Sequence, residues 1–220
     1  MSNRQRVGLR KKKPAKTRAP GRKRRQQLLD AAYELLCEKE IEDLSFRDIA
    51  ERAGTPEGSA YHHFANRFDL FAELACRLND EFIAEHNKPV PAAKRKNWSD
   101  LAEYLVDIGA RVYSKSPPAR QLFIEGKAPL QVKQAERIND RDVGDAMYRS
   151  YSRYFDIPDG DEIRSAFYYF IEITDLMFSL SVVEHGEITR GMRKEAKRAG
   201  VSYLGTYLSG HAKRRPTSTG

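Results

Sequence analysis

The stretch SFRDIAERAGTPEGSAYHHF, residues 45–64, decides the fold of this chain. Its first half repeats apolar side chains at helical spacing, which predicts a short helix through Phe46, Ile49, Ala50 and Ala53. Ser45, followed by Asp48 three residues later, has the pattern of a capping box at the helix start. Gly54 follows the last apolar position, where a helix often ends in a left-handed backbone that suits glycine.

A second short helix is predicted over Pro56–Phe64. Thr55 supplies a cap for this helix and Pro56 a first-turn proline. Ala60 and Phe64 lie four residues apart and face inward, because only apolar contacts can hold so short a helix in place. Two short helices joined by a three-residue turn with glycine are typical of the helix-turn-helix, whose second helix enters the major groove of DNA.

The outward side of this second helix is small, polar and aromatic, which suits contacts with base edges and phosphates. It exposes Glu57, Ser59 and His62, with Tyr61 and His63 at the flanks. The adjacent His62 and His63 also invite a metal site. Neighbouring helical residues point about 100° apart and no further ligand is spaced nearby, so no metal is expected.

Positive charge is concentrated at the N-terminus. Residues 1–25 hold twelve of the 39 Lys and Arg and no acidic residue, so the remainder, with 27 basic and 31 acidic side chains, is net negative. Such an arm favours a polyanion, because each neutralised phosphate releases counterions. A solvated tail without a partner is the alternative. We expect residues 1–20 to be a disordered basic arm and residues 211–220 a flexible tail.

Helical periodicity continues through most of the chain and predicts an all-α protein of about nine helices. We expect a helix-turn-helix domain over residues 21–66 and a larger helical ligand-binding and dimerisation domain over residues 67–210. The helices follow one another over residues 22–38, 46–53, 56–64, 67–87, 101–112, 117–126, 130–155, 162–185 and 189–209.

Other classes of protein are not favoured. No Ser-His-Asp order, zinc-protease motif or nucleotide loop is present, so we expect neither an enzyme nor a cofactor. The two cysteines are too few for a disulfide scaffold. The apolar stretch of residues 167–183 is interrupted by Glu172 and Asp175, and the N-terminus lacks an apolar signal core. A cytoplasmic protein without a membrane span is expected.

The helix predicted over residues 162–185 is apolar around most of its circumference, so two of its sides must be buried. A partner subunit is the natural second cover. Burial inside the core of a single chain is the alternative.

Residues 22–78 resemble the N-terminal DNA-binding domain of the TetR (tetracycline-repressor) family. The resemblance rests on LDAA at 29–32, IAERAG at 49–54, Gly58, YHHF at 61–64 and the NR-x-DL run at 66–70. It implies that the DNA-binding residues are Ser45, Arg47, Thr55, Glu57, Gly58, Ser59, Tyr61, His62, His63 and Arg67. The family usually has serine where this chain has Pro56, which lacks a hydroxyl, so Thr55 is expected to provide the cap.

The resemblance also implies a homodimer through the last two helices, a palindromic double-stranded operator and an unknown small-molecule effector. Repression is the family default. An accessory protein that binds DNA through its basic arm without sequence preference is the alternative. For Arg47 and Arg67 an ordinary solvated charge stays open, and for Tyr61 a core aromatic ring.

Candidate ligand-binding residues come from the tyrosine-rich C-terminal part. They are Tyr104, Arg120, Tyr148, Tyr151, Tyr169, Glu172 and Asp175. Glu172 and Asp175 share a helical face and are suited to a cationic or hydroxylated ligand; a solvated polar stripe on the helix is the alternative. Aromatic residues at helical spacing are more often core than pocket, so this set competes with a purely structural interpretation.

Overall fold

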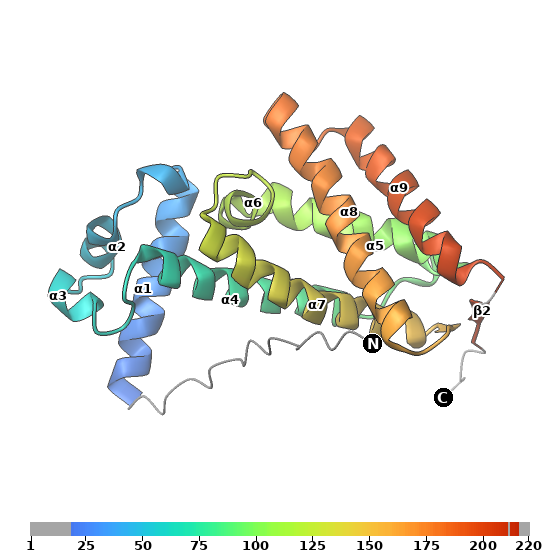
Figure 1. Cartoon of the computed structure of the whole chain (residues 1–220), viewed down its shortest axis with the longest axis horizontal. Helices are drawn as coiled ribbons and strands as arrows, with labels where there is room; N and C mark the ends of the chain where they lie inside the picture. The colour runs from blue at the N-terminus through green and yellow to red at the C-terminus, as the bar shows by residue number, and fades with distance from the viewer. Residues whose placement is uncertain (1–18, 211, 216–220) are drawn as a thin grey trace, which may run out of the picture.

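The computed structural model describes residues 19–210 and 212–215. Residues 1–18 of the basic arm predicted over residues 1–20 lie outside the described residues. The prediction is wrong for residues 19 and 20, which belong to the first helix. Nine α-helices, two 3₁₀ helices and one pair of short strands make up the described part of the chain (Figure 1). The all-α prediction is confirmed.

The elements run in order along the chain. They are α1 (Ala19–Glu38), η1 (Ile41–Asp43), α2 (Phe46–Arg52), α3 (Glu57–Ala60), α4 (Arg67–Asn87), η2 (Ala92–Lys94), α5 (Trp98–Lys115), α6 (Pro117–Phe123), α7 (Leu130–Ser152), β1 (Phe155–Asp156), α8 (Asp161–His185), α9 (Arg190–Leu208) and β2 (Lys213–Arg214).

Side-chain caps fix where several helices begin. Asn66 accepts hydrogen bonds from the Phe68 and Asp69 backbone N–H groups at the start of α4. Asn97 does the same for α5, and Thr189 accepts from Met192 N–H at the start of α9. Each cap satisfies a donor that the first turn of a helix leaves unpaired. These starts are therefore encoded locally in the sequence.

The helices α1, α2 and α3 gather at one end of the molecule, and α8 and α9 pack side by side at the other (Figure 1). The long helix α4 leads out of the first group and packs along α7, which in turn packs against α8. Short α6 contacts both α1 and α4. Helix α4 therefore connects the helix-turn-helix end of the molecule to the packed helices α7 and α8.

The C-terminal tail departs from expectation. β1 and β2 pair antiparallel, with Phe155 opposite Arg214 and Asp156 opposite Lys213. Arg215 N–H also donates to the Tyr154 carbonyl at 2.8 Å. Part of the predicted flexible tail therefore has regular structure. Two residues are too few to show the alternation that marks a strand, so only the tertiary contact reveals the pairing.

Helix α8 is long and apolar enough, by length and composition alone, to cross a membrane. Its Phe167, Phe170 and Phe178 side chains instead belong to the buried core of the protein. A core helix passes the same test, so this is weak support for a membrane span.

Candidate nucleic-acid interface and internal cavity

The start of α2 is fixed by the predicted capping box. Ser45 Oγ accepts from Asp48 N–H at 3.1 Å, and Asp48 Oδ2 accepts from Ser45 N–H at 2.9 Å. Ser45 Oγ also donates to Asp48 Oδ2 at 2.5 Å, and this bond, followed by the one from Ser45 N–H, holds the pKa of the Asp48 carboxyl below its usual range. Ser45 stays exposed at the helix N-terminus, where unpaired N–H groups favour an anion such as a phosphate.

The turn after α2 follows the prediction in one respect and departs from it in another. Gly54 has φ +58°, the left-handed conformation expected of a helix-ending glycine. The Thr55 cap is wrong, because the Thr55 hydroxyl points back to the Ala53 carbonyl at 3.4 Å and α3 begins after Pro56 without a side-chain cap. Thr55 is also buried, so as placed it offers little to DNA.

Helix α3 is shorter than predicted and ends at Ala60, with turns over residues 61–63. Ala60 and Phe64 are buried as expected, at 0% and 2% exposure. The structure leaves the opposite side open: Glu57, Gly58, Ser59, Tyr61 and His62 are exposed, and His63 is half-buried. The polar surface predicted to face DNA is therefore accessible.

Tyr61 was predicted to be either a DNA contact or a core aromatic ring, and its position is compatible with both. The ring lies 4.7 Å from that of Phe46 between centroids, yet the residue is 50% exposed. His63 has a pKa below its usual value, chiefly because of partial burial and then the nearby Arg25 and Arg24. His63 is therefore neutral at pH 7 in the free protein and offers a hydrogen bond rather than a charge.

The two candidate arginines differ in their partners. Arg47 is exposed and forms an i,i+4 ion pair with Glu51 at 2.9 Å. Exposed ion pairs contribute little free energy, so a DNA phosphate can replace Glu51 as the partner of Arg47 at little cost. Arg67 is half-buried, donates to the Leu44 carbonyl and lies over the Phe68 ring. Arg67 already has a structural task, which is to join the start of α4 to the loop before α2.

Arg25 of α1 is a positioning residue that the sequence pattern did not single out. Its guanidinium forms a two-pronged ion pair with Glu73 of α4, donates to the His63 carbonyl and lies 4.0 Å from the Phe64 ring centroid. It therefore ties α1, α4 and the turn after α3 together. The available signal was its spacing of three residues from buried Leu28, which places it on the inner side of α1.

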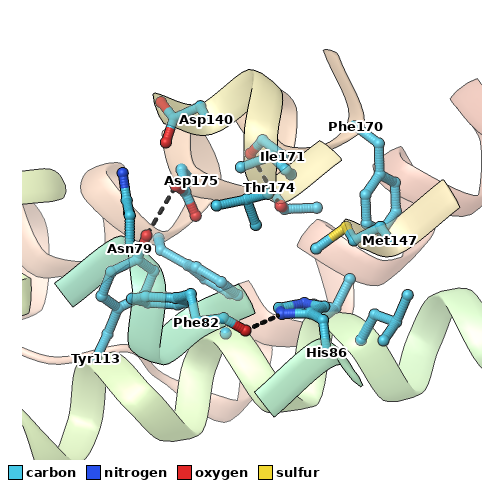
Figure 2. Close-up of a pocket in the computed structure, with 15 residues that line it drawn as sticks. Asn79, Phe82, His86, Tyr113, Asp140, Met147, Phe170, Ile171, Thr174 and Asp175 are labelled. Carbon is cyan, nitrogen blue, oxygen red and sulfur yellow. Dashed lines mark hydrogen bonds between the residues drawn. The ribbon is translucent and has the colours of Figure 1, made fainter. Parts of the chain in front are cut away.

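An internal cavity of about 30 Å³ lies between α4, α5, α7 and α8 (Figure 2). Of the seven predicted ligand-binding residues, Asp175 alone is among its lining residues. Tyr113 donates to Asp175 Oδ2 at 2.8 Å, and this pair stands at one end of the cavity. Burial raises the pKa of Asp175 to about 7, against the lowering effect of the Tyr113 hydrogen bond.

The structure does not bring the other predicted ligand-binding residues together. Tyr151 is a fully buried core residue whose hydroxyl donates to the Trp98 carbonyl at 3.0 Å. Tyr148 packs against Phe167 with 5.9 Å between centroids. The others lie apart: Arg120 pairs with Glu125, Tyr104 borders a groove between α5 and α9, Tyr169 is exposed on α8, and Glu172 borders a cleft beside the cavity.

Two cavity residues that the sequence did not reveal are buried polar side chains. Asn79 and His86, both on α4, are 5% and 2% exposed. His86 Nδ1 lies 2.7 Å from the Phe82 carbonyl, while His86 Nε2 and Asn79 Nδ2 have no hydrogen-bond partner among the residues that the structure describes. Burial lowers the pKa of His86, so its ring is neutral at pH 7. Each is a histidine or asparagine inside an apolar helix pattern, which is the signal that was available.

Gln121 of α6 connects the cavity-bearing part of the chain to α1. Its amide nitrogen donates to the carbonyls of Leu36 and Lys39, at 2.8 and 3.0 Å, and its amide oxygen accepts from Ile41 N–H at 2.7 Å. One buried side chain thus satisfies three backbone groups where α1 ends. Gln121 thus links the end of α1 to α6 through three hydrogen bonds.

An all-α chain with an exposed helix-turn-helix at one end and an internal cavity beside the connecting helix defines a class of DNA-binding regulators. Comparison with known proteins agrees. Residues 28–74 match the model of the bacterial regulatory proteins of the tetR family, and residues 96–208 match the tetracyclin repressor-like C-terminal domain. The chain belongs to the TetR family of transcriptional regulators, so the predicted resemblance is confirmed.

The relatives align mainly over the DNA-binding end. The chain is 36% identical over 70 residues to the HTH-type transcriptional regulator AcrR of Shigella flexneri, which is 32% of each protein. It is 34% identical over 67 residues to the HTH-type transcriptional repressor KstR2 of Rhodococcus jostii, covering 30% of this chain and 33% of the relative. The chain thus spans about a third of the length of these relatives.

Solved structures share the fold over most of the chain. A TetR-family regulator from Streptomyces coelicolor superposes with a TM-score of 0.62 at 22% identity, covering 84% of this chain and 99% of that one. A TetR regulator from Rhodococcus sp. RHA1 gives a TM-score of 0.66 at 19% identity, over 84% and 97% of the two chains. At this identity the likeness concerns the fold alone.

Proposed function

We propose that this protein is a ligand-responsive transcriptional repressor that binds a near-palindromic operator as a homodimer in the cytoplasm. The observation that carries the proposal is the exposed polar side of α3 and its following turn, held from behind by buried Ala60 and Phe64. Ser59, Tyr61 and His63 are the proposed phosphate contacts, and Glu57, Gly58 and His62 lie nearest the bases. Such a surface fits the major groove.

A row of apolar side chains on α8 supports the dimer. Tyr169, Leu176, Leu180 and Val183 are 46%, 59%, 42% and 72% exposed, and half-buried Ile173 continues the row. Their spacing of four and three residues places them on one face of the helix. The chain's own α7 and α9 cover the other faces, so a second copy of this row is the natural cover.

A two-fold axis between α8 helices gives two recognition segments, which read half-sites about 34–36 Å apart. The cavity lies where α4 meets α7 and α8. A ligand that widens it moves α4, and with α4 the recognition segment, relative to the partner copy. By linkage, operator DNA and ligand then change each other's affinity by the same factor.

Operator binding is tested by selecting bound fragments from the host genome and footprinting them. A specific repressor protects one short near-palindrome and prefers it over bulk DNA by on the order of 10³ or more. Tyr61→Phe and Ser59→Ala should weaken that binding, while Tyr104→Phe and Ser114→Ala on α5, which lie away from α3, serve as matched controls. If both pairs of variants bind alike, the phosphate contacts are wrongly assigned.

The dimer is tested by analytical ultracentrifugation of Leu176→Glu. We expect this variant to sediment as a monomer and to lose affinity for the full operator, because a charge in an apolar interface is costly. Leu130→Glu is the matched control, since Leu130 is 69% exposed on α7 and lies outside the α8 row. A dimeric Leu176→Glu protein would place the interface elsewhere.

The second candidate function is an accessory DNA-binding protein that uses the basic N-terminal arm. The charge of residues 1–25 favours it. Deleting residues 2–18 should reduce the salt dependence of binding and leave the base preference intact if the protein is a specific repressor. Equal affinity of the full chain for any duplex would favour the accessory function.

A further inference from the structure

The internal cavity has apolar walls and carboxylates of one charge sign. Asp140 of α7 and Asp175 of α8 are among its lining residues, and none of the described residues that line it is Lys or Arg. The walls are mainly aromatic and aliphatic: Phe82, Val143, Met147, Phe170, Ile171 and Phe178. An anion brought into this space meets negative charge in apolar surroundings, whereas a cation with an apolar body finds both of its requirements met.

The end of the cavity away from Asp175 presents a hydrogen-bond acceptor. His86 Nδ1 carries the ring hydrogen, because it faces the Phe82 carbonyl at 2.7 Å. His86 Nε2 is therefore an acceptor and is buried, and no group in the described part of the chain donates to it. Figure 2 shows the His86 ring facing the open space between Phe82, Thr174 and Met147. Buried polar atoms of this kind are normally paired with a water or a ligand.

The carboxylate end adjoins the surface of the protein. A second cleft, of about 150 Å³, shares Asp140 and Asp175 with the cavity and also borders Lys133, Arg137 and Glu172. The two carboxylates thus stand between the cleft and the inner cavity. A ligand that enters through the cleft passes them first and places its apolar end deepest.

We propose that the cavity binds a compact organic cation, an alkylammonium group on an aromatic or aliphatic body with a hydroxyl or N–H donor at its far end. The ammonium lies between Asp140 and Asp175, the body lies against Phe82 and Phe178, and the donor binds His86 Nε2. This ligand class rests on the proposed function, in which the cavity is the effector site.

The size of the cavity explains how such a ligand acts. About 30 Å³ holds only one or two water molecules, so an arylalkylamine must widen it. Asn79, Phe82 and His86 all come from α4, and the opposing walls come from α5, α7 and α8. Widening therefore displaces α4, the helix that leads to the recognition segment.

Binding of an ammonium group is expected to depend on pH through Asp175. Burial raises the pKa of Asp175 to about 7; Glu172 also raises it, whereas the Tyr113 hydrogen bond and Lys133 lower it. Asp140 faces the same space, and His86 is neutral there. Below pH 7 the cation must displace a proton from Asp175, so its affinity should fall by up to roughly tenfold per pH unit and level off above pH 7.

The ligand class is tested by calorimetry on the full chain at pH 8 with three probes of one shape: tyramine, 2-(4-hydroxyphenyl)ethanol and 4-hydroxyphenylacetate. A second, larger pair of probes, 4-phenylbutylamine and 4-phenylbutanol, tests whether the cavity accommodates a longer ligand. We expect each amine to bind roughly tenfold or more tightly than its alcohol, because charge-assisted hydrogen bonds are the stronger kind. Amines that bind no better than the alcohols, or a tighter-binding carboxylate, would overturn the proposal.

Variants assign the charge to a residue. Asp175→Asn should remove the preference for amine over alcohol, whereas Glu162→Gln, an exposed carboxylate on the same helix, should keep it. Thermal unfolding of each variant shows that the fold is retained. His86→Phe should reduce the affinity for tyramine and leave that for phenethylamine, which lacks the hydroxyl. An amine preference that survives Asp175→Asn contradicts the site.

Operator binding is measured separately on the same samples. Specific operator binding without any amine preference overturns the ligand class and leaves the repressor intact. Amine binding that leaves operator affinity unchanged supports the site and contradicts the proposed ligand response.

Discussion

Gly200→Ala tests how closely α9 packs against the cavity wall. Gly200 faces α8, and a Cβ added there meets Phe170 Cε2 at 2.5 Å, Phe170 Cδ2 at 2.9 Å and Thr174 Cγ2 at 3.2 Å. Phe170 is 1% exposed and lines the cavity. Gly200 is not among the glycines with positive φ, so alanine can adopt the helical backbone there and the clash with Phe170 is the only obstacle.

Two opposing effects decide the size of the change. Alanine in place of glycine inside a helix gains about 1 kcal/mol of stability. Forcing an extra methyl group into a packed core costs about 1–3 kcal/mol. At 2.5 Å the Phe170 ring must move, and the space beside it is the cavity. We therefore expect a net loss of about 1 kcal/mol in unfolding free energy and a cavity with less room for a ligand.

Urea denaturation at one protein concentration measures the change, since dimer stability depends on concentration. Gly191→Ala is the matched control on the same helix, because its Cβ meets no atom closer than Thr189 Oγ1 at 3.9 Å. We expect this control to gain up to about 1 kcal/mol. A Gly200→Ala protein as stable as Gly191→Ala would refute the close packing of Gly200 on Phe170.

Three further substitutions test other contacts. Gln121→Ala leaves three backbone groups at the end of α1 unpaired, so urea unfolding should show a loss of about 2 kcal/mol or more; an unchanged free energy would contradict the clamp. The lysine of Arg25→Lys cannot form the two-pronged pair with Glu73, so affinity for the operator in a gel shift should fall severalfold. Unchanged affinity would show that the turn after α3 does not depend on Arg25. Asp175→Asn removes a carboxyl whose pKa rises from 3.8 to about 7 on folding. Because the native chain binds this proton more tightly than the unfolded chain, the unfolding free energy of the wild type falls between about pH 4 and 7. Relative to the wild type, the unfolding free energy of the variant should therefore rise by about 2–4 kcal/mol from pH 4 to pH 8. If the difference in unfolding free energy between variant and wild type is the same at pH 4 and pH 8, the pKa of Asp175 is not raised by folding.

The helix-turn-helix was predictable residue by residue where its signals are local. The capping box of Ser45 and Asp48, the left-handed Gly54 and the buried pair of Ala60 and Phe64 all follow from spacings of three or four residues. Thr55 was misassigned because sequence spacing does not show where its hydroxyl points. The actual partner is a carbonyl two residues back.

The cavity was far less predictable. Tyrosines were the natural candidates for ligand contacts, yet Tyr151 is a core residue and Tyr169 faces outward. The cavity instead takes Asn79 and His86 from α4, two polar side chains in an apolar helix pattern whose burial the sequence spacing does not show. Which side chains share a cavity depends on how α4, α5, α7 and α8 cross.

Most of the helices, the Ser45 cap and the polar surface of the recognition segment could be predicted from the sequence, because they depend on neighbours within one or two helical turns. Tertiary structure alone decided that Gln121 holds the end of α1, that Arg25 supports the turn after α3, and that Asp175 and His86 bound one cavity. Those contacts join residues about 40 to 90 positions apart. Their partners are chosen by helix packing, which no short spacing in the chain records.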